Sequence, residues 1–269
     1  MFRCAIVPAL ALGLVATCSV QATETHAHPH LQCSYDSDFD VQVEPAGIAF
    51  TRDNGRPGDV FMHDGQLRVD GKTMVVSAAD AERLRDYERQ VRALLPAMAE
   101  LARDGVAIGY AAMTTVVATL DDNGDERTRL QQELRDRHRD ALRQIDTTLG
   151  RGVWNAGDID RAFGNNLQDT VADLAGSLTR DVLKDTLSGD PAKWAALEAR
   201  ADSLDATIDK AIVAPADKLA QRAEALCPRF DALERLQQQF QFRLATGEHL
   251  QLLTPDMDHN HKASQYAQR

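Results

Sequence analysis

The sequence lacks the short motifs that identify the common classes of enzyme. It contains no G-x-S-x-G, H-E-x-x-H, P-loop or G-x-G-x-x-G pattern, and these patterns supply the nucleophile, the metal ligands or the phosphate-binding loop of those classes. The acidic run 121–125 does not fit a calcium-binding EF-hand, because its glycine is the fourth residue and Gln132 stands at the twelfth position. We therefore expect a non-enzymatic binding or scaffold protein, with a hydrolase whose site forms only in three dimensions as an alternative.

Basic residues are also scarce. The chain has 30 Lys and Arg against 41 Asp and Glu, which gives a net charge of −11 at pH 7. An acidic surface repels the phosphates of nucleic acids and of anionic lipids. We therefore expect no nucleic-acid partner, and solubility is a sufficient explanation of the charge.

A long apolar run stands at the start of the chain. Cys4–Val20 is almost entirely apolar, follows a short positive segment and ends in small residues, which predicts a secretory signal peptide over residues 1–22. The run is short for a membrane span of about 20 residues, and polar sequence follows at once, so we expect no transmembrane segment in the mature chain. Cleavage is expected after Ala22 or after Ala27. Lipidation of Cys18 is a minor alternative, and would give an outer-membrane lipoprotein.

Cysteine is rare in the mature chain, since cleavage leaves only Cys33 and Cys227. No C-x-x-C pair is present, so a redox-active site is not indicated. An exported protein meets an oxidising compartment, and we therefore expect a disulfide bond between Cys33 and Cys227. Two buried thiols, or a bond to a thiol elsewhere, are the alternatives.

Histidines gather near both ends of the chain. The candidate metal ligands are His26, His28, His30, Asp258, His259 and His261. Imidazole and carboxylate groups suit zinc, copper or nickel. We expect the two segments that carry them, a leader over residues 23–32 and a tail over residues 246–269, to be disordered, which opposes tight binding. A metal-binding protein is therefore an alternative function, and no resident cofactor is expected.

Residues 33–76 are predicted to form a small antiparallel β-meander of about four or five strands. The pairs Asp64-Gly65 and Asp70-Gly71 each lie between short apolar runs. Asp-Gly in that setting favours a tight hairpin, because both residues of the turn need positive φ.

Residues 77–245 are predicted to form an elongated antiparallel helical bundle that belongs to the same domain as the meander. Ser77 and Asp80 form a capping-box pattern, and apolar residues then recur at spacings of three and four at Leu84, Tyr87, Val91, Leu94, Met98 and Leu101. Pro96 is expected to kink this helix or to divide it. The aromatic content of 5% is low, which favours coiled packing over a large globular core.

The next stretch, residues 105–120, carries no charge, and we interpret it as a core helix because 16 residues are short for a membrane span. Gly105 and Gly109 are expected to let a neighbouring backbone approach closely.

Further helices are expected over about residues 126–149, after Asp158, around Trp194 and from Pro215 onward. Trp154, in a loop, is expected to fold over a helix end, or else to anchor a ligand or partner. His63 and His138 are expected to be exposed. The fold class is thus α+β, and heptad-like spacing permits a homo-oligomer without requiring one.

The order of these parts resembles a known family. Cys33 opens the region, the two Asp-Gly turns follow, a small-residue helix runs through Leu94-Leu95-Pro96 and Gly105-Val106-Ala107-Ile108, and Ala225-Leu226-Cys227 comes near the end. This arrangement is similar to the YggN family of exported proteins of Gram-negative bacteria, a domain of unknown function, over about residues 31–244. The resemblance implies a periplasmic location and an envelope partner or ligand of unknown identity. It carries over no catalytic residue.

Overall fold

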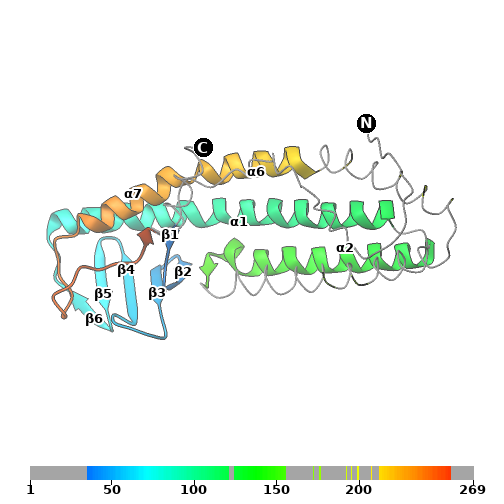
Figure 1. The fold of residues 1–269 in the computed structure, drawn as a ribbon. Coiled ribbons are helices and arrows are strands. Elements are labelled where there is room, and N and C mark those ends of the chain that lie inside the picture. The colour runs from blue at the N-terminus through cyan, green and yellow to red at the C-terminus, as the bar shows by residue number, and fades with distance from the viewer. Residues whose placement is uncertain are drawn as a thin grey trace, which may run out of the picture.

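The computed structural model of the chain describes residues 35–120, 124–155 and 212–255, together with six separate helical positions between 172 and 207. An antiparallel sheet lies at one end, and long helices cover it and extend past it (Figure 1). The predicted α+β arrangement of a meander followed by long packed helices is confirmed. The predicted signal peptide, the leader, and most of the helices expected after Asp158 and around Trp194 lie outside the described residues.

The sheet is a meander of five consecutive strands with a sixth short strand at one edge. The strands are β2 (Asp40–Glu44), β3 (Gly47–Thr51), β4 (Asp59–His63), β5 (Gln66–Val69), β6 (Lys72–Met74) and β7 (Val153–Trp154), in the order β6-β5-β4-β3-β2-β7. Both Asp-Gly pairs form the predicted turns. Their four residues all have positive φ, between 45° and 78°, as a type I′ hairpin requires.

Two strands depart from the predicted meander. β1 (Tyr35–Asp36) lies outside the six-stranded sheet and pairs with β8 (Thr254–Pro255), from the other end of the chain. β7 extends the sheet instead, since Trp154 lies opposite Val41 of β2. The expectation that Trp154 folds over a helix end is therefore wrong.

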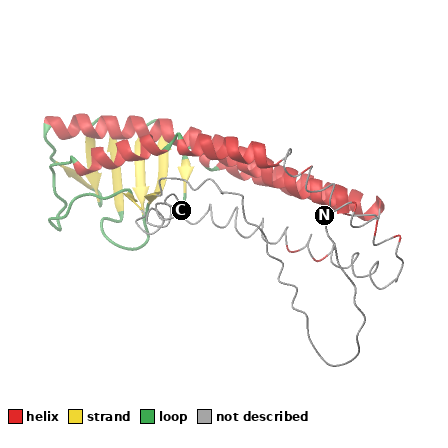
Figure 2. Ribbon diagram, turned by 45° about the horizontal axis from the view of Figure 1, so that its top comes forward, coloured by secondary structure: helices red, strands yellow, loops and turns green. Residues whose placement is uncertain are grey.

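One helix, α1 (Ala78–Leu120), covers the inner face of the sheet with its first half (Figure 2). Its N-terminus has the predicted capping box, in which the Ser77 hydroxyl accepts a hydrogen bond from the Asp80 N–H at 3.1 Å. Pro96 does not divide the helix, because α1 runs unbroken through it for 43 residues. The residues beside the proline, Leu94 and Leu95, are buried in the core, and this packing supports the helix where a backbone hydrogen bond is missing.

The second half of α1 packs against α2 (Gly124–Thr147), which runs back along it towards the sheet (Figure 1). The helix predicted over about residues 126–149 is confirmed, and its buried residues are Leu130, Leu134 and Ile145. His138 is not an exposed histidine as predicted. Its ring stacks on Tyr110 of α1 at a centroid distance of 5.2 Å, and its Nε2 atom is buried.

Gly105 and Gly109 differ from each other in their surroundings. A Cβ on Gly105 would contact Leu219 at 3.5 Å, whereas one on Gly109 would meet nothing within 4 Å. The predicted close approach is therefore absent at Gly109 in the part of the chain that the structure describes.

The helix expected from Pro215 onward is two helices, α6 (Ala214–Glu224) and α7 (Cys227–Gln238). Pro228 explains the break, because its ring would clash with the carbonyl of Glu224, four residues earlier, in a continuous helix. On α6, Arg222 forms an ion pair with Asp104 of α1. A short 3₁₀ helix, η1 (Leu149–Arg151), links α2 to β7. None of the described helices is long and apolar enough to cross a membrane.

Residues 240–255 form a C-terminal strap that returns from α7 across the sheet end of the molecule (Figure 1). The prediction of a frayed tail over residues 246–269 is wrong for residues 246–255. Leu250 and Leu252 in this segment are buried at 0% and 3% exposure, and β8 pairs with β1. Residues 256–269 lie outside the described part of the chain.

Candidate functional site: an apolar pocket beside the sheet

A cavity of about 110 Å³ lies where the sheet, α1, α7 and the strap meet. Its lining comes from five parts of the chain that are far apart in sequence: Tyr35, Ser37, Val41, Phe50, Tyr87, Val91, Leu94, Leu95, Met98, Trp154, Phe230, Leu233, Leu252 and Leu253. Thirteen of these side chains are apolar or aromatic, and none is a carboxylate or a basic group. The pocket therefore offers contact area to an apolar group and no acid–base pair in its wall.

The sheet wall of the pocket is one row of side chains across three strands. Val41 lies opposite Phe50 on one side and opposite Trp154 on the other. Directly opposed residues of antiparallel strands share a face, so the three side chains point the same way. β7 thus lengthens the row by one large aromatic residue at the edge of the sheet.

The helix wall comes mainly from the predicted apolar stripe of α1. Tyr87, Val91, Leu94 and Met98 recur at spacings of three and four, which places them on one face of the helix. Across the cavity, Phe230 and Leu233 of α7 repeat the spacing of three.

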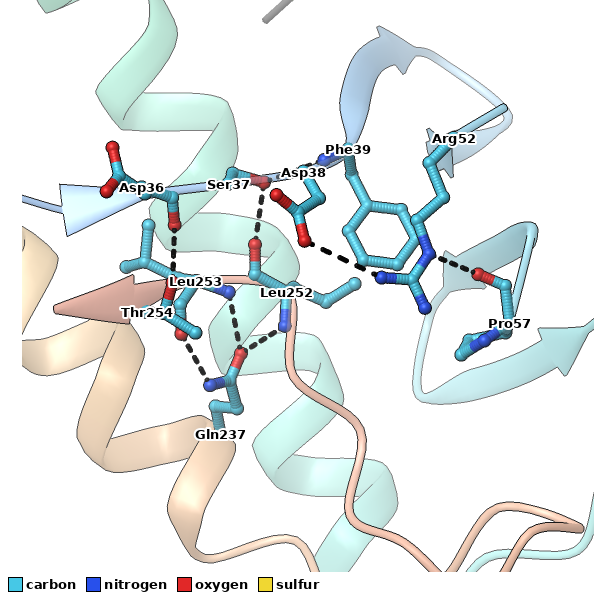
Figure 3. A network of polar contacts seen from close by, with 10 residues as sticks. All are labelled: Asp36, Ser37, Asp38, Phe39, Arg52, Pro57, Gln237, Leu252, Leu253 and Thr254. Atoms are coloured by element: carbon cyan, nitrogen blue, oxygen red, sulfur yellow. Dashed lines mark hydrogen bonds and ion pairs between the residues drawn. The ribbon is translucent and has the colours of Figure 1, made fainter. Parts of the chain in front are cut away.

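The strap closes the pocket with Leu252 and Leu253, and a buried glutamine holds it in place (Figure 3). Gln237 of α7 is 5% exposed. Its Oε1 atom accepts hydrogen bonds from the Leu252 N–H at 2.6 Å and the Leu253 N–H at 3.0 Å, and its Nε2 donates to the Leu253 carbonyl at 2.8 Å. From the opposite side, the Ser37 hydroxyl donates to the Leu252 carbonyl at 2.7 Å. One amide side chain therefore satisfies three backbone groups of the strap.

A second anchor holds the start of the strap to the start of α1. Asp80 is 1% exposed, and it accepts hydrogen bonds from the Gln241 N–H at 3.1 Å and from Arg83 at 2.9 Å, besides its contact with Ser77. Desolvation raises the pKa of this carboxyl, but the hydrogen bonds from Gln241, Ser77 and Arg83 outweigh it, so the pKa lies below its usual value. Asp80 is therefore a buried carboxylate that the fold keeps ionised.

Tyr35 joins the pocket to the carboxylates of α7, and we call the side of the pocket at its hydroxyl the rim. The Tyr35 ring stacks on Phe230 at 5.6 Å between centroids. Its hydroxyl donates a hydrogen bond to Asp231 and lies 3.4 Å from Glu234, both on α7. Burial, and then the contact with Asp231, raise the pKa of Tyr35. The hydroxyl thus stays protonated beside two carboxylates.

The residues that the sequence suggested as a site are placed only in part. Cys227 is the first residue of α7 and is disulfide-bonded. Its predicted partner, Cys33, lies outside the described residues, so the pairing stays a prediction. The predicted metal ligands, His28, His30, Asp258, His259 and His261, also lie outside them. Within the described residues, no group of three or more His, Cys, Asp or Glu could hold a metal ion.

The pocket itself was not predicted from the sequence. Two parts of its lining had a signal in the sequence: the apolar stripe of α1, and Trp154, for which a role as a ligand anchor was the alternative prediction. The strap was missed because Leu250-Gln251-Leu252-Leu253 is too short to show a period. That apolar run near the end of the chain was the available signal.

The family to which the chain is similar spans all the residues that line the pocket. A family model described as "Protein of unknown function (DUF2884)" matches residues 33–253. Proteins named "Uncharacterized protein YggN" from Escherichia coli strains K12, CFT073 (O6:H1) and O157:H7 are each 25% identical over an alignment of 174 positions that covers 60% of this chain and 72% of the relative. No solved structure matches the chain significantly. The predicted resemblance to the YggN family is confirmed.

Proposed function

This chain belongs to the DUF2884 family, and from that premise we propose that it is an exported, non-enzymatic binding protein of the bacterial envelope. The observation that supports this proposal is the apolar pocket of about 110 Å³ between the sheet, α1, α7 and the strap. Concave apolar pockets with few polar groups are typical of ligand-binding sites. All of its lining residues fall within the family match of 33–253.

The pocket is built from rigid elements, which suits binding. Tyr87 and Leu94 belong to the buried core as well as to the lining. The strap is fixed at two points, by Gln237 and by Asp80. A preformed cavity costs a ligand little ordering of the protein, so more of the contact energy appears as affinity.

Replacing Val91 with phenylalanine is expected to weaken binding at the pocket. Val91 lines the cavity and is 7% exposed, so a larger side chain occupies the space of the ligand. The test is a calorimetric titration with hexan-1-ol, a neutral probe of suitable size. Saturable one-to-one binding is expected in the wild type, weakened at least about tenfold in the variant, which corresponds to about 1.4 kcal/mol.

The same substitution at Val75 is the control, because that side chain is 96% exposed and does not line the cavity. Val75→Phe should bind hexan-1-ol as the wild type does. Equal binding by Val91→Phe and the wild type, at unchanged stability, would show that the probe binds elsewhere and would contradict a binding role of this pocket.

Export and the disulfide are part of the same proposal. The stacking of Tyr35 on Phe230 supports a bond between Cys33 and Cys227, since these cysteines precede the two rings by two and three residues. Such a bond would tie the start of the domain to α7, which forms one wall of the pocket.

Native mass spectrometry of the protein isolated without reductant from the periplasm tests both points. We expect a chain that begins at residue 23 or 28 and is about 2 Da lighter than its fully reduced form, since a disulfide removes two hydrogens. An uncleaved chain or two free thiols would contradict the proposal. A chain that carries the additional mass of a lipid on Cys18 would instead identify the protein as a lipoprotein.

A further inference from the structure

The pocket is rich in aromatic rings for a chain that has few of them. Five of the fourteen aromatic residues of the whole sequence, Tyr35, Phe50, Tyr87, Trp154 and Phe230, line this one cavity. Leucine would fill the same walls if apolar contact were the only requirement. Aromatic faces add attraction for a cation, because the ring quadrupole is negative at its face.

The two charged groups that contact the Tyr35 hydroxyl, at the rim, are both acidic. Asp231 and Glu234 lie on α7 at the hydroxyl end of Tyr35, and both are half-buried. Apart from Tyr35, their side-chain partner is the neutral amide of Gln238, which donates to Glu234 at 2.8 Å. Among the residues that the structure describes, neither carboxylate forms an ion pair with Lys, Arg or His. The basic residues nearest to them in sequence, Arg229 and Arg235, are both exposed.

These two features select among ligands that carry an apolar group. An anionic ligand, such as a fatty acid, would find no basic group in the lining and would meet two carboxylates at the rim. A cationic ligand would place its apolar group in the cavity and would find negative charge at the rim, beside the stacked rings of Tyr35 and Phe230. The net charge of −11 favours the approach of the cation as well.

We propose that the pocket binds a small organic cation, an alkyl- or arylammonium compound, with its apolar group in the cavity and its ammonium group at the rim near Asp231 and Glu234. This inference rests on the proposed binding function and names the class of ligand. The cavity of about 110 Å³ is somewhat smaller than the roughly 150 Å³ cavity that holds benzene in an engineered protein. A group of about six carbons is therefore the expected limit.

Three probes of one size and different charge test the inference: hexylammonium, hexan-1-ol and hexanoate. Trp154 lines the pocket and reports binding through its fluorescence, in a Trp194→Phe background that removes the other tryptophan. We expect hexylammonium to bind about tenfold more tightly than hexan-1-ol, and hexanoate to bind most weakly. The preference should shrink at high salt, because exposed charges are screened.

The double variant Asp231→Asn, Glu234→Gln should bring the affinity for hexylammonium to within about twofold of that for hexan-1-ol. Both substitutions keep size and hydrogen-bonding capacity, and unchanged hexan-1-ol binding confirms that the pocket is intact. If the double variant does not fold, Glu234→Gln alone makes the test, since its contact with Tyr35 is the longer one at 3.4 Å. Asp217→Asn, at an exposed position on α6, removes one charge away from the pocket and should leave the preference unchanged.

The possible outcomes separate the two proposals. Equal binding of the three probes, or a cation preference that survives the double variant, overturns the assignment of a cationic ligand while the pocket remains a binding site. Failure of all three probes to bind overturns the proposed function itself.

Discussion

Replacing Gln237 with alanine is expected to lower the free energy of unfolding by about 3 kcal/mol, because the substitution releases the C-terminal strap. The side chain is buried and makes three hydrogen bonds to the backbone of Leu252 and Leu253. Alanine leaves two N–H groups and a carbonyl without these partners at the edge of the core. Each unsatisfied buried group costs about 1 kcal/mol or more.

Urea denaturation followed by circular dichroism measures this effect, and the neighbouring glutamine provides the control. Gln238 is exposed, and its amide bonds only to Glu234, one turn earlier. Gln238→Ala should therefore change the stability by no more than about 0.5 kcal/mol. A similar small change at both positions would mean that the strap contributes little to the stability of the domain.

The variant also links stability to the proposed site. Leu252 and Leu253 line the pocket, so release of the strap opens one wall of it. We expect Gln237→Ala to weaken binding of the hexan-1-ol probe under conditions in which the remaining core is still folded, because the Tyr87 ring of α1 also packs on Phe50 of the sheet, at 6.3 Å between centroids.

Local signals in the sequence were sufficient for the turns and the first helix. Asp64-Gly65 and Asp70-Gly71 form their turns because positive φ is a property of the two residues themselves. The capping box at Ser77 and Asp80 is likewise made within four residues. These parts of the fold depend on neighbours in the chain, and for that reason they could be predicted.

Proline shows where local reasoning ends. Pro96 and Pro228 both lack the N–H that a helix needs, yet α1 continues through the first and α6 ends before the second. At Pro96 the flanking leucines are buried in the core, and their packing outweighs the lost hydrogen bond. The result depends on tertiary contacts, which the sequence pattern around a proline does not contain.

The candidate site depends almost wholly on such distant contacts. Tyr35 meets α7 across 196 residues of sequence, and Ser37 bonds to the strap across 215. β7 is only two residues long, too short for an alternating pattern. The residues of each wall form no distinctive sequence pattern. The cavity exists because the two ends of the domain come together, so no local motif could have predicted it.

Replacing Asp80 with alanine is expected to cost about 4 kcal/mol at pH 7, the largest effect of any substitution considered for this chain. The carboxylate is 1% exposed, pairs with Arg83, and accepts hydrogen bonds from the Ser77 hydroxyl and from the Gln241 N–H of the strap. Alanine removes all of these contacts together. Asp86→Ala is the matched control, because Asp86 also pairs with an arginine three residues later but its side chain is 40% exposed, and it should cost about 0.5 kcal/mol or less.

The dependence on pH distinguishes loss of the charge from loss of packing. The pKa of Asp80 is lower in the folded protein than its usual value of about 3.9, so ionised Asp80 stabilises the fold above that pH. This contribution is lost as the pH falls through the folded-state pKa. Urea unfolding between pH 7 and pH 3 should therefore show the gap between wild type and Asp80→Ala narrowing below about pH 4. A gap that stays constant would mean that the carboxylate acts through its volume alone, and that the ionised group does not tie the strap to the first turn of α1.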